Sequence, residues 1–438
     1  MTAGAFMIAA PRSGSGKTTI TLGLISALRR RGLDVRAAKT GPDYIDPAFH
    51  AAATGHPCFN IDSWAMTPNL ISQLLTRGAG DAGIMIIEAA MGLFDGVEAP
   101  PGRTGRPADI AARFRLPVVL VLDVSGQGQT AAATVHGLAR YARNVRVAGV
   151  ILNRVGSERH RNIVSRAINA LGIPVFGGVP RQADLALPER HLGLVQATEH
   201  GDLENYLAKL AGMIETHIDL EAVLSVLAPL PDKPRQHLVS LPPPGQSIAL
   251  AHDAAFTFIY PHLLELWRAA GAEIRAFSPL ADEGPPEGCD VCWLPGGYPE
   301  LHAGALAAAS KFHAALHRFA QAQPVYGECG GYMVLGNAIE DAKGQQHQML
   351  GLLGHTTSFA KRRLTLGYRR ATLSHRSVLG APGKIVLGHE FHYATVCDAG
   401  SDQPLATFTD SHGTPPIIAG GVRGHVSGSF FHMLCPAP

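Results

Sequence analysis

The chain has 438 residues, which is more than a single compact core normally contains, so two or three domains are expected. Its formal net charge of +2, from 37 Lys and Arg against 35 Asp and Glu, excludes the strongly basic character that marks a nucleic-acid or anionic-membrane partner. No apolar stretch approaches the roughly 20 residues that span a bilayer. Six scattered cysteines predict a reduced, cytoplasmic setting.

Short apolar runs alternate with amphipathic stretches through the first half of the chain. Strands are predicted at 5–10, 34–39, 84–89, 117–124, 147–155 and 174–180. Apolar residues recur at helical spacing in 19–32 and 128–142, which predicts helices there. This alternation predicts an α/β fold with a doubly wound, mainly parallel sheet and helices on both faces.

The composition changes at residues 226–246, which hold six prolines and show no sustained periodicity. We interpret this stretch as a linker between a first domain at 1–225 and a second at 247–438. Strand-like runs resume at 247–253, 273–279, 291–297, 324–330 and 384–390. The second domain is therefore also predicted to be α/β.

A phosphate-binding loop is predicted where the first strand meets the first helix, in PRSGSGKT at 11–18. Backbone N–H groups would close around phosphate oxygens, the lysine would neutralise phosphate charge, and the threonine hydroxyl would serve Mg²⁺. The full pattern expects glycine where this chain has Pro11, and a glycine-rich turn without a ligand is the alternative. The predicted nucleotide-binding residues are Gly14, Ser15, Gly16, Lys17, Thr18 and Thr19.

Mg²⁺ needs one or two carboxylates close to the phosphates, and two strand ends can supply them. Asp43 and Asp46 follow the second predicted strand, while Glu88 ends the third and Asp95 lies in the loop beyond it. Ligands bind at the carboxyl ends of parallel strands in such sheets. Helix caps and turns are the alternative role for these acids.

A second reactive centre is predicted at Cys329 in YGECGGYM. A strand leads to the cysteine, and Gly330 and Gly331 lead away into a predicted helix, which is the pattern of a nucleophile elbow. The helix N-terminus would favour the thiolate, and the Gly330 N–H would hold an oxyanion. Gly297, in the glycine-rich loop at 295–300, is the second expected donor. The CDVC pair at 289–292 is interpreted as a buried strand, not a zinc site.

A cysteine nucleophile needs a general base, and three histidines are candidates. His432 is favoured because it ends a small and aromatic run from which a last strand or loop could return to the elbow. His389 and His392 compete with it. Spacing alone does not separate the three.

These motifs together resemble the cobyrinic acid a,c-diamide synthase family, including its hydrogenobyrinic acid branch. The resemblance covers essentially the whole chain, because SGSGKTT, GPDYIDPAFH, EAAMGLFDG, LPGGYPE, GECGGYM and GSFFH occur in the family's order. It implies a synthetase domain similar to dethiobiotin synthetase, followed by a flavodoxin-like class I glutamine amidotransferase domain. It also implies ATP and Mg²⁺ as cofactors, with L-glutamine and a corrinoid acid as substrates.

The resemblance also implies roles for matching residues of the first domain. Lys17 and Lys39 would contact phosphates or the substrate carboxylate, and Mg²⁺ would be held by Thr18, Asp46 and Glu88. The activation site would be lined by Asp43, Tyr44 and Asp95. Asn153 would help to read adenine.

In the second domain the resemblance matches Cys329 to the nucleophile and His432 to the base. Many class I glutaminases carry Glu two residues after this histidine, where this chain has Leu434. Either another acid, such as Glu328 or Glu390, orients the imidazole, or the enzyme uses a dyad.

The predicted activity is ATP- and glutamine-dependent amidation of the a and c acetates of cobyrinic or hydrogenobyrinic acid. Cobyric acid synthase and nickel-sirohydrochlorin a,c-diamide synthase are alternatives with similar chemistry. A partitioning-type ATPase with an inert cysteine domain is a third alternative from another class. The cobalt content of the substrate, the order of amidation and the number of subunits stay open, with a homodimer as one option.

Overall fold

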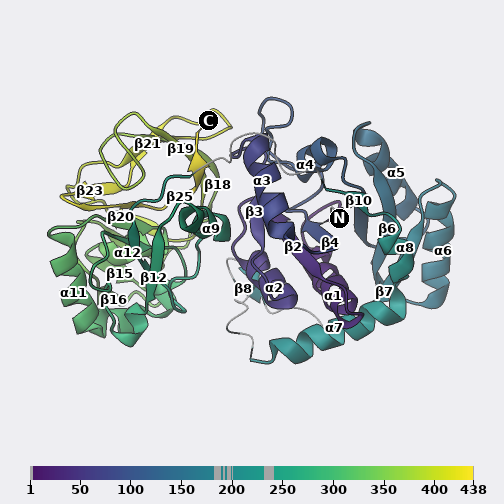
Figure 1. Cartoon of the computed structure of the whole chain (residues 1–438), viewed down its shortest axis with the longest axis horizontal. Coiled ribbons are helices and arrows are strands. Elements are labelled where there is room, and N and C mark those ends of the chain that lie inside the picture. The colour runs from purple at the N-terminus through teal and green to yellow at the C-terminus, as the bar shows by residue number, and fades with distance from the viewer. Residues whose placement is uncertain are drawn as a thin grey trace. The chain divides into compact units, whose positions relative to one another are not determined.

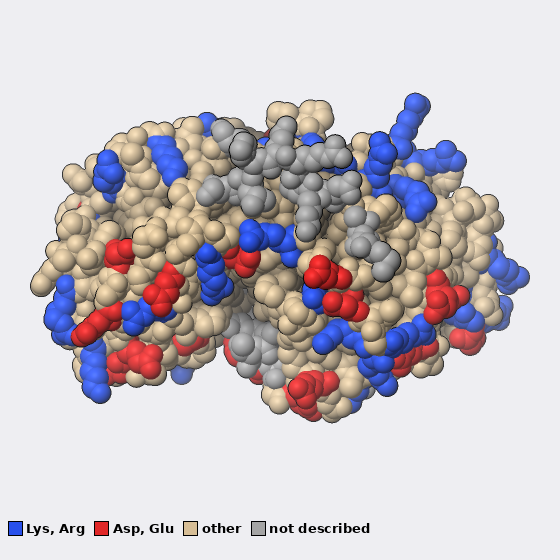
Figure 2. Space-filling model, viewed as in Figure 1, with Lys and Arg blue, Asp and Glu red and all other residues tan. Residues whose placement is uncertain are grey.

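The computed structural model describes residues 3–181, 189–190, 193–194, 199, 201–230 and 241–437. The chain divides into two compact units, Met1–Val239 and Ser240–Pro438. Among the described residues, no helix combines the length and the apolar character that crossing a bilayer requires. Positive and negative side chains are interspersed over the face shown in Figure 2, in keeping with the balanced charge.

The first unit is built from strands and helices in close alternation (Figure 1). Its elements are β1 (Gly4–Ala9), α1 (Lys17–Arg30), β2 (Val35–Thr40), α2 (Ile45–Thr54), β3 (Phe59–Ile61), α3 (Pro68–Ala79), β4 (Ile84–Glu88), α4 (Pro107–Phe114), β5 (Val118–Asp123), α5 (Ala131–Tyr141), β6 (Val147–Val155), α6 (Glu158–Asn169), β7 (Val175–Pro180), β8 (Glu189–Arg190), β9 (Gly193–Leu194), α7 (Leu203–His217), α8 (Leu220–Leu224) and β10 (Ala228–Pro229).

A single twisted sheet forms the centre of this unit, with strand order β3-β2-β4-β1-β5-β6-β7. These seven strands pair in parallel, and β10 adds to β1 in the antiparallel sense. Every residue of β4 and β5 is buried, as expected for strands that are covered on both faces. The predicted doubly wound parallel sheet is confirmed.

The connections between parallel strands distribute the helices over both faces of the sheet. Since such crossovers are right-handed, the reversal of strand order between β3 and β4 places α1 and α2 on one face and α3 to α6 on the other. The contacts of α1 with α2 and α7, and of α5 with α6, agree with this arrangement (Figure 1). The carboxyl ends of β1, β2 and β4, which are neighbours in the sheet, therefore meet at one edge.

The second unit contains one mainly parallel sheet, one antiparallel sheet and one mixed sheet, in which β15 and β17 pair in parallel. Its elements are β11 (Ser247–Ala251), α9 (Pro261–Ala269), β12 (Glu273–Phe277), β13 (Val291–Leu294), α10 (Ala303–Ala308), α11 (Ser310–Ala320), β14 (Val325–Glu328), α12 (Gly330–Leu335), β15 (Ala338–Glu340), β16 (Gln346–Gln348), β17 (Thr356–Ser358), β18 (Thr365–Leu373), β19 (Ile385–His392), β20 (Thr395–Asp398), β21 (Ala406–Thr409), β22 (Ile417–Ala419), β23 (Gly421–Arg423), β24 (Val426–Ser429) and β25 (His432–Pro436).

The main sheet of this unit has the order β12-β11-β13-β14-β24-β23. Its strands pair in parallel except for β23, which runs antiparallel to β24. The predicted strand at 384–390 forms as β19, but it lies in the antiparallel sheet β22-β21-β18-β19-β25. The parallel sheet of the second unit is therefore as predicted, whereas the other two sheets were not predicted.

The stretch expected to be a linker, residues 226–246, is described only in part. Ala228 and Pro229 form β10 and pair with β1, so this portion belongs to the sheet of the first unit. Residues 231–240 lie outside the described part of the chain. The other end of the stretch leads into β11, which begins at Ser247 as expected.

Gly331 in α12 provides a direct test of how β13 and α12 pack. A Cβ at this position would lie 2.0 Å from the Leu294 carbonyl oxygen, which belongs to rigid main chain. We expect Gly331→Ala to lower the free energy of unfolding of this unit by about 1–3 kcal/mol. Gly304→Ala in α10 is the matched control, because its Cβ would meet nothing closer than 3.8 Å. Denaturant unfolding followed by tryptophan fluorescence measures both; equal stability of the two variants would contradict the packing.

Candidate active sites

The predicted phosphate loop joins β1 to α1 and is held in shape by neighbouring chain segments. Gly16 adopts a left-handed conformation with φ of 91°, and α1 begins at the next residue. The Asn153 side-chain amide donates a hydrogen bond to the Ser15 carbonyl over 2.9 Å. A Cβ on Gly16 would lie 2.1 Å from that amide nitrogen, so glycine is required there. In this structure Asn153 supports the loop, and its expected contact with adenine stays a prediction.

The amine of Lys17 is directed towards the loop that follows β4. Its Nζ donates to the Met91 carbonyl over 2.6 Å. Burial, and then the charge of Lys39, lower the pKa of Lys17. The amine thus lies in a poorly solvated position, where a phosphate group would be a strong partner.

Five of the predicted residues meet in one charged cluster at the edge formed by β1, β2 and β4. The Lys39 Nζ lies 2.8 Å from Glu88 Oε1, also pairs with Asp46, and lies 3.7 Å from Asp43 Oδ2. The Thr18 Oγ1 lies 2.9 Å from Glu88 Oε1 and 3.2 Å from Asp46 Oδ2, so its one proton can be donated to either carboxylate. The structure therefore brings together side chains from α1, β2, α2 and β4.

Burial and mutual charge determine the protonation of this cluster. Burial, followed by the charge of Asp43, raises the pKa of Asp46 to about 7. Burial opposes the charged forms of Glu88 and Lys39 as well, but their pairing dominates. It holds the pKa of Glu88 well below its usual value and that of Lys39 well above it. Asp46 is thus the carboxyl whose charge responds most readily to a change in its neighbours.

His50 belongs to the same cluster and was missed by the sequence reasoning. Its Nε2 lies 2.7 Å from Glu88 Oε2, and the side chain is fully buried. Although burial opposes the charge, Glu88 raises the pKa of His50 to about 10, so the imidazolium donates to the carboxylate. A sequence signal exists: His50 follows Asp46 by four residues, which places both on one face of α2.

The oxygen donors of this cluster fit Mg²⁺ better than a transition metal. Among the described residues, no group of three or more His, Cys, Asp or Glu side chains is arranged to hold a metal ion. The available set is two carboxylates and one hydroxyl, from Asp46, Glu88 and Thr18. Mg²⁺ is typically held by one or two carboxylates and completed by water and phosphate oxygens.

Two further predicted residues lie around the cluster. The Asp95 carboxylate accepts a hydrogen bond from the Gly92 N–H over 2.8 Å, which closes the loop after β4. Tyr44 occupies the N-cap position of α2, between Asp43 and Asp46. Both are therefore close in sequence to the charged residues, while their contact with a substrate stays a prediction.

Cys329 occupies the sharp turn that the sequence predicts between β14 and α12. Its φ of 51° and ψ of −102° are strained for a residue with a side chain. The Cys329 N–H donates to the Ser429 carbonyl over 2.8 Å, which ties the turn to the end of β24. The backbone geometry expected of a nucleophile elbow is present.

The surroundings of the Cys329 thiol favour its protonated form. Burial, and then the charges of Glu300 and Glu328, raise the pKa of Cys329. The Gly330 N–H acts in the opposite direction but does not overcome burial. The expected stabilisation of a thiolate by the helix N-terminus is thus outweighed, and a base is needed to remove the proton.

The glycine-rich loop after β13 brings the predicted elements of this second centre together. A Cβ on Gly296 would lie 2.6 Å from His432 Cε1 and 3.3 Å from Cys329 Cβ, so both residues border the same glycine. A Cβ on Gly330 would lie 3.0 Å from the Gly297 nitrogen. The two predicted oxyanion donors therefore lie beside each other and next to the thiol.

The three candidate histidines form one cluster on β19 and β25. His432 pairs with His389 across the two strands, with ring centroids 5.1 Å apart. His389 contacts the Tyr260 hydroxyl at 3.0 Å, and His392 stacks on Phe430 at 3.9 Å. Burial, and then His389 and His392, hold the pKa of His432 well below its usual value. Its imidazole is therefore neutral and able to accept a proton.

The two acids considered as a third catalytic member have different partners. Glu328 accepts a hydrogen bond from the Met433 N–H over 2.6 Å, and burial raises its pKa to about 8. Glu390 pairs with Arg369 over 2.7 Å. Glu328 thus holds the backbone immediately after His432, whereas Glu390 is neutralised by an arginine.

The buried Glu328 carboxyl predicts a dependence of stability on pH. Its pKa rises from 4.5 to about 8 on folding, so the protein takes up a proton between these values. The resulting stabilisation is complete below the unfolded pKa and is lost as the pH rises through 8. We expect denaturant midpoints of this unit to fall between about pH 5 and 8 and to level off above pH 8, and Glu328→Gln to abolish that fall. An unchanged pH dependence in the variant would show that Glu328 is already ionised.

Comparisons with known proteins match each part of the chain to a domain family. Residues 6–195 match the CobQ/CobB/MinD/ParA nucleotide binding domain, and residues 247–438 match the CobB/CobQ-like glutamine amidotransferase domain. The chain is 59% identical to hydrogenobyrinate a,c-diamide synthase of Mesorhizobium japonicum, with 100% of both chains covered. The enzymes of that name from Agrobacterium fabrum and Rhodobacter capsulatus are 57% and 55% identical, with 99% and 98% of both chains covered. The chain belongs to the hydrogenobyrinate a,c-diamide synthase family.

Proposed function

We propose that this protein uses ATP and glutamine to convert the a and c acetates of hydrogenobyrinic or cobyrinic acid into amides. The observation that carries the proposal is the presence, in one chain, of a phosphate loop facing a carboxylate cluster and a strained cysteine beside a neutral histidine. The first centre suits activation of a carboxylate, and the second suits release of nitrogen from glutamine. Membership of the family supports the choice of substrate.

In the first unit, a substrate carboxylate attacks the γ-phosphorus of ATP, and ADP leaves. The product is an acyl phosphate, which gives the carbonyl a good leaving group. Lys17 offsets charge on the transferred phosphoryl group, and the backbone N–H groups of residues 14–19 hold the other phosphates. Thr18, Asp46 and Glu88 would hold Mg²⁺, which would supply positive charge beside the phosphates.

In the second unit, the Cys329 thiol gives its proton to the neutral imidazole of His432 and attacks the side-chain amide of glutamine. The Gly297 and Gly330 N–H groups stabilise the oxyanion, and ammonia leaves with the proton returned by His432. Water then hydrolyses the thioester to glutamate. The ammonia displaces phosphate from the acyl phosphate, which completes the amide.

The identity of the macrocycle is tested by incubating the pure protein with ATP, Mg²⁺, glutamine and a panel of tetrapyrrole acids. The panel contains hydrogenobyrinic acid, cobyrinic acid, cobyrinic acid a,c-diamide and nickel-sirohydrochlorin. Mass spectrometry should detect a diamide of one of the first two. A product from only the third or fourth acid would favour a related amidotransferase. ATP hydrolysis without any amide product would favour a nucleotide switch.

The division of labour between the two units predicts distinct variant phenotypes. Cys329→Ala should reduce glutamine-dependent amidation at least about 100-fold and leave amidation with ammonium salts near the wild-type rate. Cys397→Ala is the matched control, because Cys397 is an exposed free thiol. Loss of both activities in Cys329→Ala would contradict separate centres.

Changes in the activation site should have the opposite effect, with amidation lost and glutamine hydrolysis kept. Lys17→Ala and Glu88→Gln should each slow amidation about 100-fold or more with either nitrogen source, because no acyl phosphate forms. Glutamine hydrolysis, measured as release of glutamate, checks that the second unit is folded. Amide synthesis from ammonia at the wild-type rate in either variant would show that phosphoryl transfer takes place elsewhere.

A further inference from the structure

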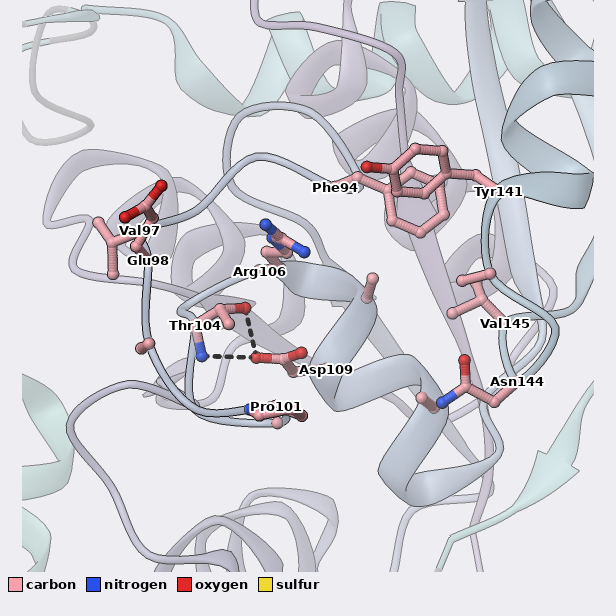
Figure 3. A pocket seen from close by; sticks show the side chains of 15 residues that line it. Phe94, Val97, Glu98, Pro101, Thr104, Arg106, Asp109, Tyr141, Asn144 and Val145 are labelled. Atoms are coloured by element: carbon pink, nitrogen blue, oxygen red, sulfur yellow. Dashed lines mark hydrogen bonds between the residues drawn. The ribbon is translucent and has the colours of Figure 1, made fainter.

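A cavity of about 440 Å³ lies in the first unit beside the loop that follows β4 (Figure 3). Its walls come from residues 94–109, from Ala112 in α4, and from residues 141–145 at the end of α5. The volume is within the range of small-molecule sites but too small for a whole tetrapyrrole. The cavity suits one arm of a large ligand.

Hydrogen bonds link the loop that forms one wall of this cavity to the phosphate loop. The Met91 carbonyl accepts the hydrogen bond from Lys17 described above. Two residues further on, Leu93 donates to the Ala10 carbonyl over 2.9 Å and accepts from the Ala108 N–H over 3.0 Å. The loop that forms one wall of the cavity is therefore anchored to the loop that binds phosphate.

Arg106 brings a positive charge to the wall of the cavity. Its Nε is buried and forms no hydrogen bond, and Arg106 makes no ion pair with any residue the structure describes. The Arg106 side chain packs directly against Gly96, because a Cβ on Gly96 would lie 2.5 Å from Arg106 Cγ. A buried donor without a partner is costly, so a ligand acceptor would be strongly favoured.

The acids that line the cavity do not neutralise this arginine. Asp109 Oδ2 already accepts hydrogen bonds from the Ser63 hydroxyl and from both the N–H and the hydroxyl of Thr104. Glu98 is exposed on the loop wall. In Figure 3 the Arg106 guanidinium is drawn between Val97 and Glu98 on one side and the aromatic pair on the other.

That aromatic pair gives the cavity an apolar border. The rings of Phe94 and Tyr141 have centroids 4.6 Å apart, and Tyr141 is 70% exposed. Met91, on the same loop as Phe94, is 57% exposed. An exposed apolar edge beside the half-buried Arg106 guanidinium matches a ligand with a flat apolar ring and an anionic arm.

We propose that this cavity binds a non-reacting carboxylate arm of the macrocyclic polyacid, with Arg106 as its counter-ion and Phe94 and Tyr141 under the ring edge. The inference rests on the proposed function, because the substrate keeps other carboxylates when two acetates are amidated. Pairing a remote carboxylate with a fixed guanidinium orients the ring relative to the phosphate loop. Arg106 is thus a specificity-determining residue that does not touch the reacting atoms.

Arg106→Gln tests this assignment. We expect the Kd of hydrogenobyrinic acid, measured by absorbance titration of the full-length protein, and its KM to rise about 10-fold. The KM for ATP and the rate of glutamine hydrolysis should not change. Arg113→Gln, an exposed arginine in α4 that does not line the cavity, is the matched control. An unchanged Kd for the polyacid in Arg106→Gln overturns the inference.

Ala112→Phe provides a second test that leaves Arg106 in place. The larger side chain fills part of the cavity, so the KM for the polyacid should rise while the KM for ATP stays constant. Wild-type turnover of the polyacid with normal kinetics in this variant would also overturn the inference. Failure of the proposed function would give a different result, because the wild-type protein itself would then neither bind nor amidate any corrinoid acid.

Discussion

The structure of the first unit depends on charges buried at adjacent strand ends. The parallel register of β2 and β4 places Lys39 directly opposite Glu88, and both side chains are almost completely buried. Burying either charge alone would be very costly, so each requires the other. Thr18 and His50 occupy the remaining positions around Glu88, which fixes α1 and α2 against the same edge. The buried Lys39–Glu88 pair therefore holds the start of α1, and with it the phosphate loop, through Thr18.

The second unit applies a different constraint to a different group. There the reactive atom is a neutral thiol, and burial keeps both Cys329 and His432 uncharged. The strained backbone of Cys329 exposes it to the two N–H donors, while the hydrogen bond from Met433 to Glu328 fixes the strand that carries His432. Proton transfer from thiol to imidazole creates a charge pair only when a substrate is present to react. The first unit thus keeps a permanent buried ion pair, whereas the second forms an ion pair only during the reaction.

Much of this arrangement is readable from the sequence because it depends on local patterns. The glycines of the phosphate loop, the apolar parallel strands and the Cys329 elbow each have a signature within about ten residues. Most of the strands that follow α12 carry no comparable apolar run and were not predicted, although β19 was. His50 lies in a motif that was recognised, but its contact with Glu88 depends on how α2 packs. Arg106 has no signature, because its importance depends on the lack of a partner among the residues that the structure describes.

The central claim is that the carboxylate of the substrate is activated as an acyl phosphate in the first unit. It is tested most directly with a corrinoid acid whose acetate carboxylates are labelled with ¹⁸O, incubated with ATP, Mg²⁺ and glutamine. Each amide formed should transfer one ¹⁸O atom into inorganic phosphate, which mass spectrometry of the phosphate detects. Amide formation that leaves the phosphate unlabelled would contradict the account, because the carboxylate oxygen would then have departed by another route.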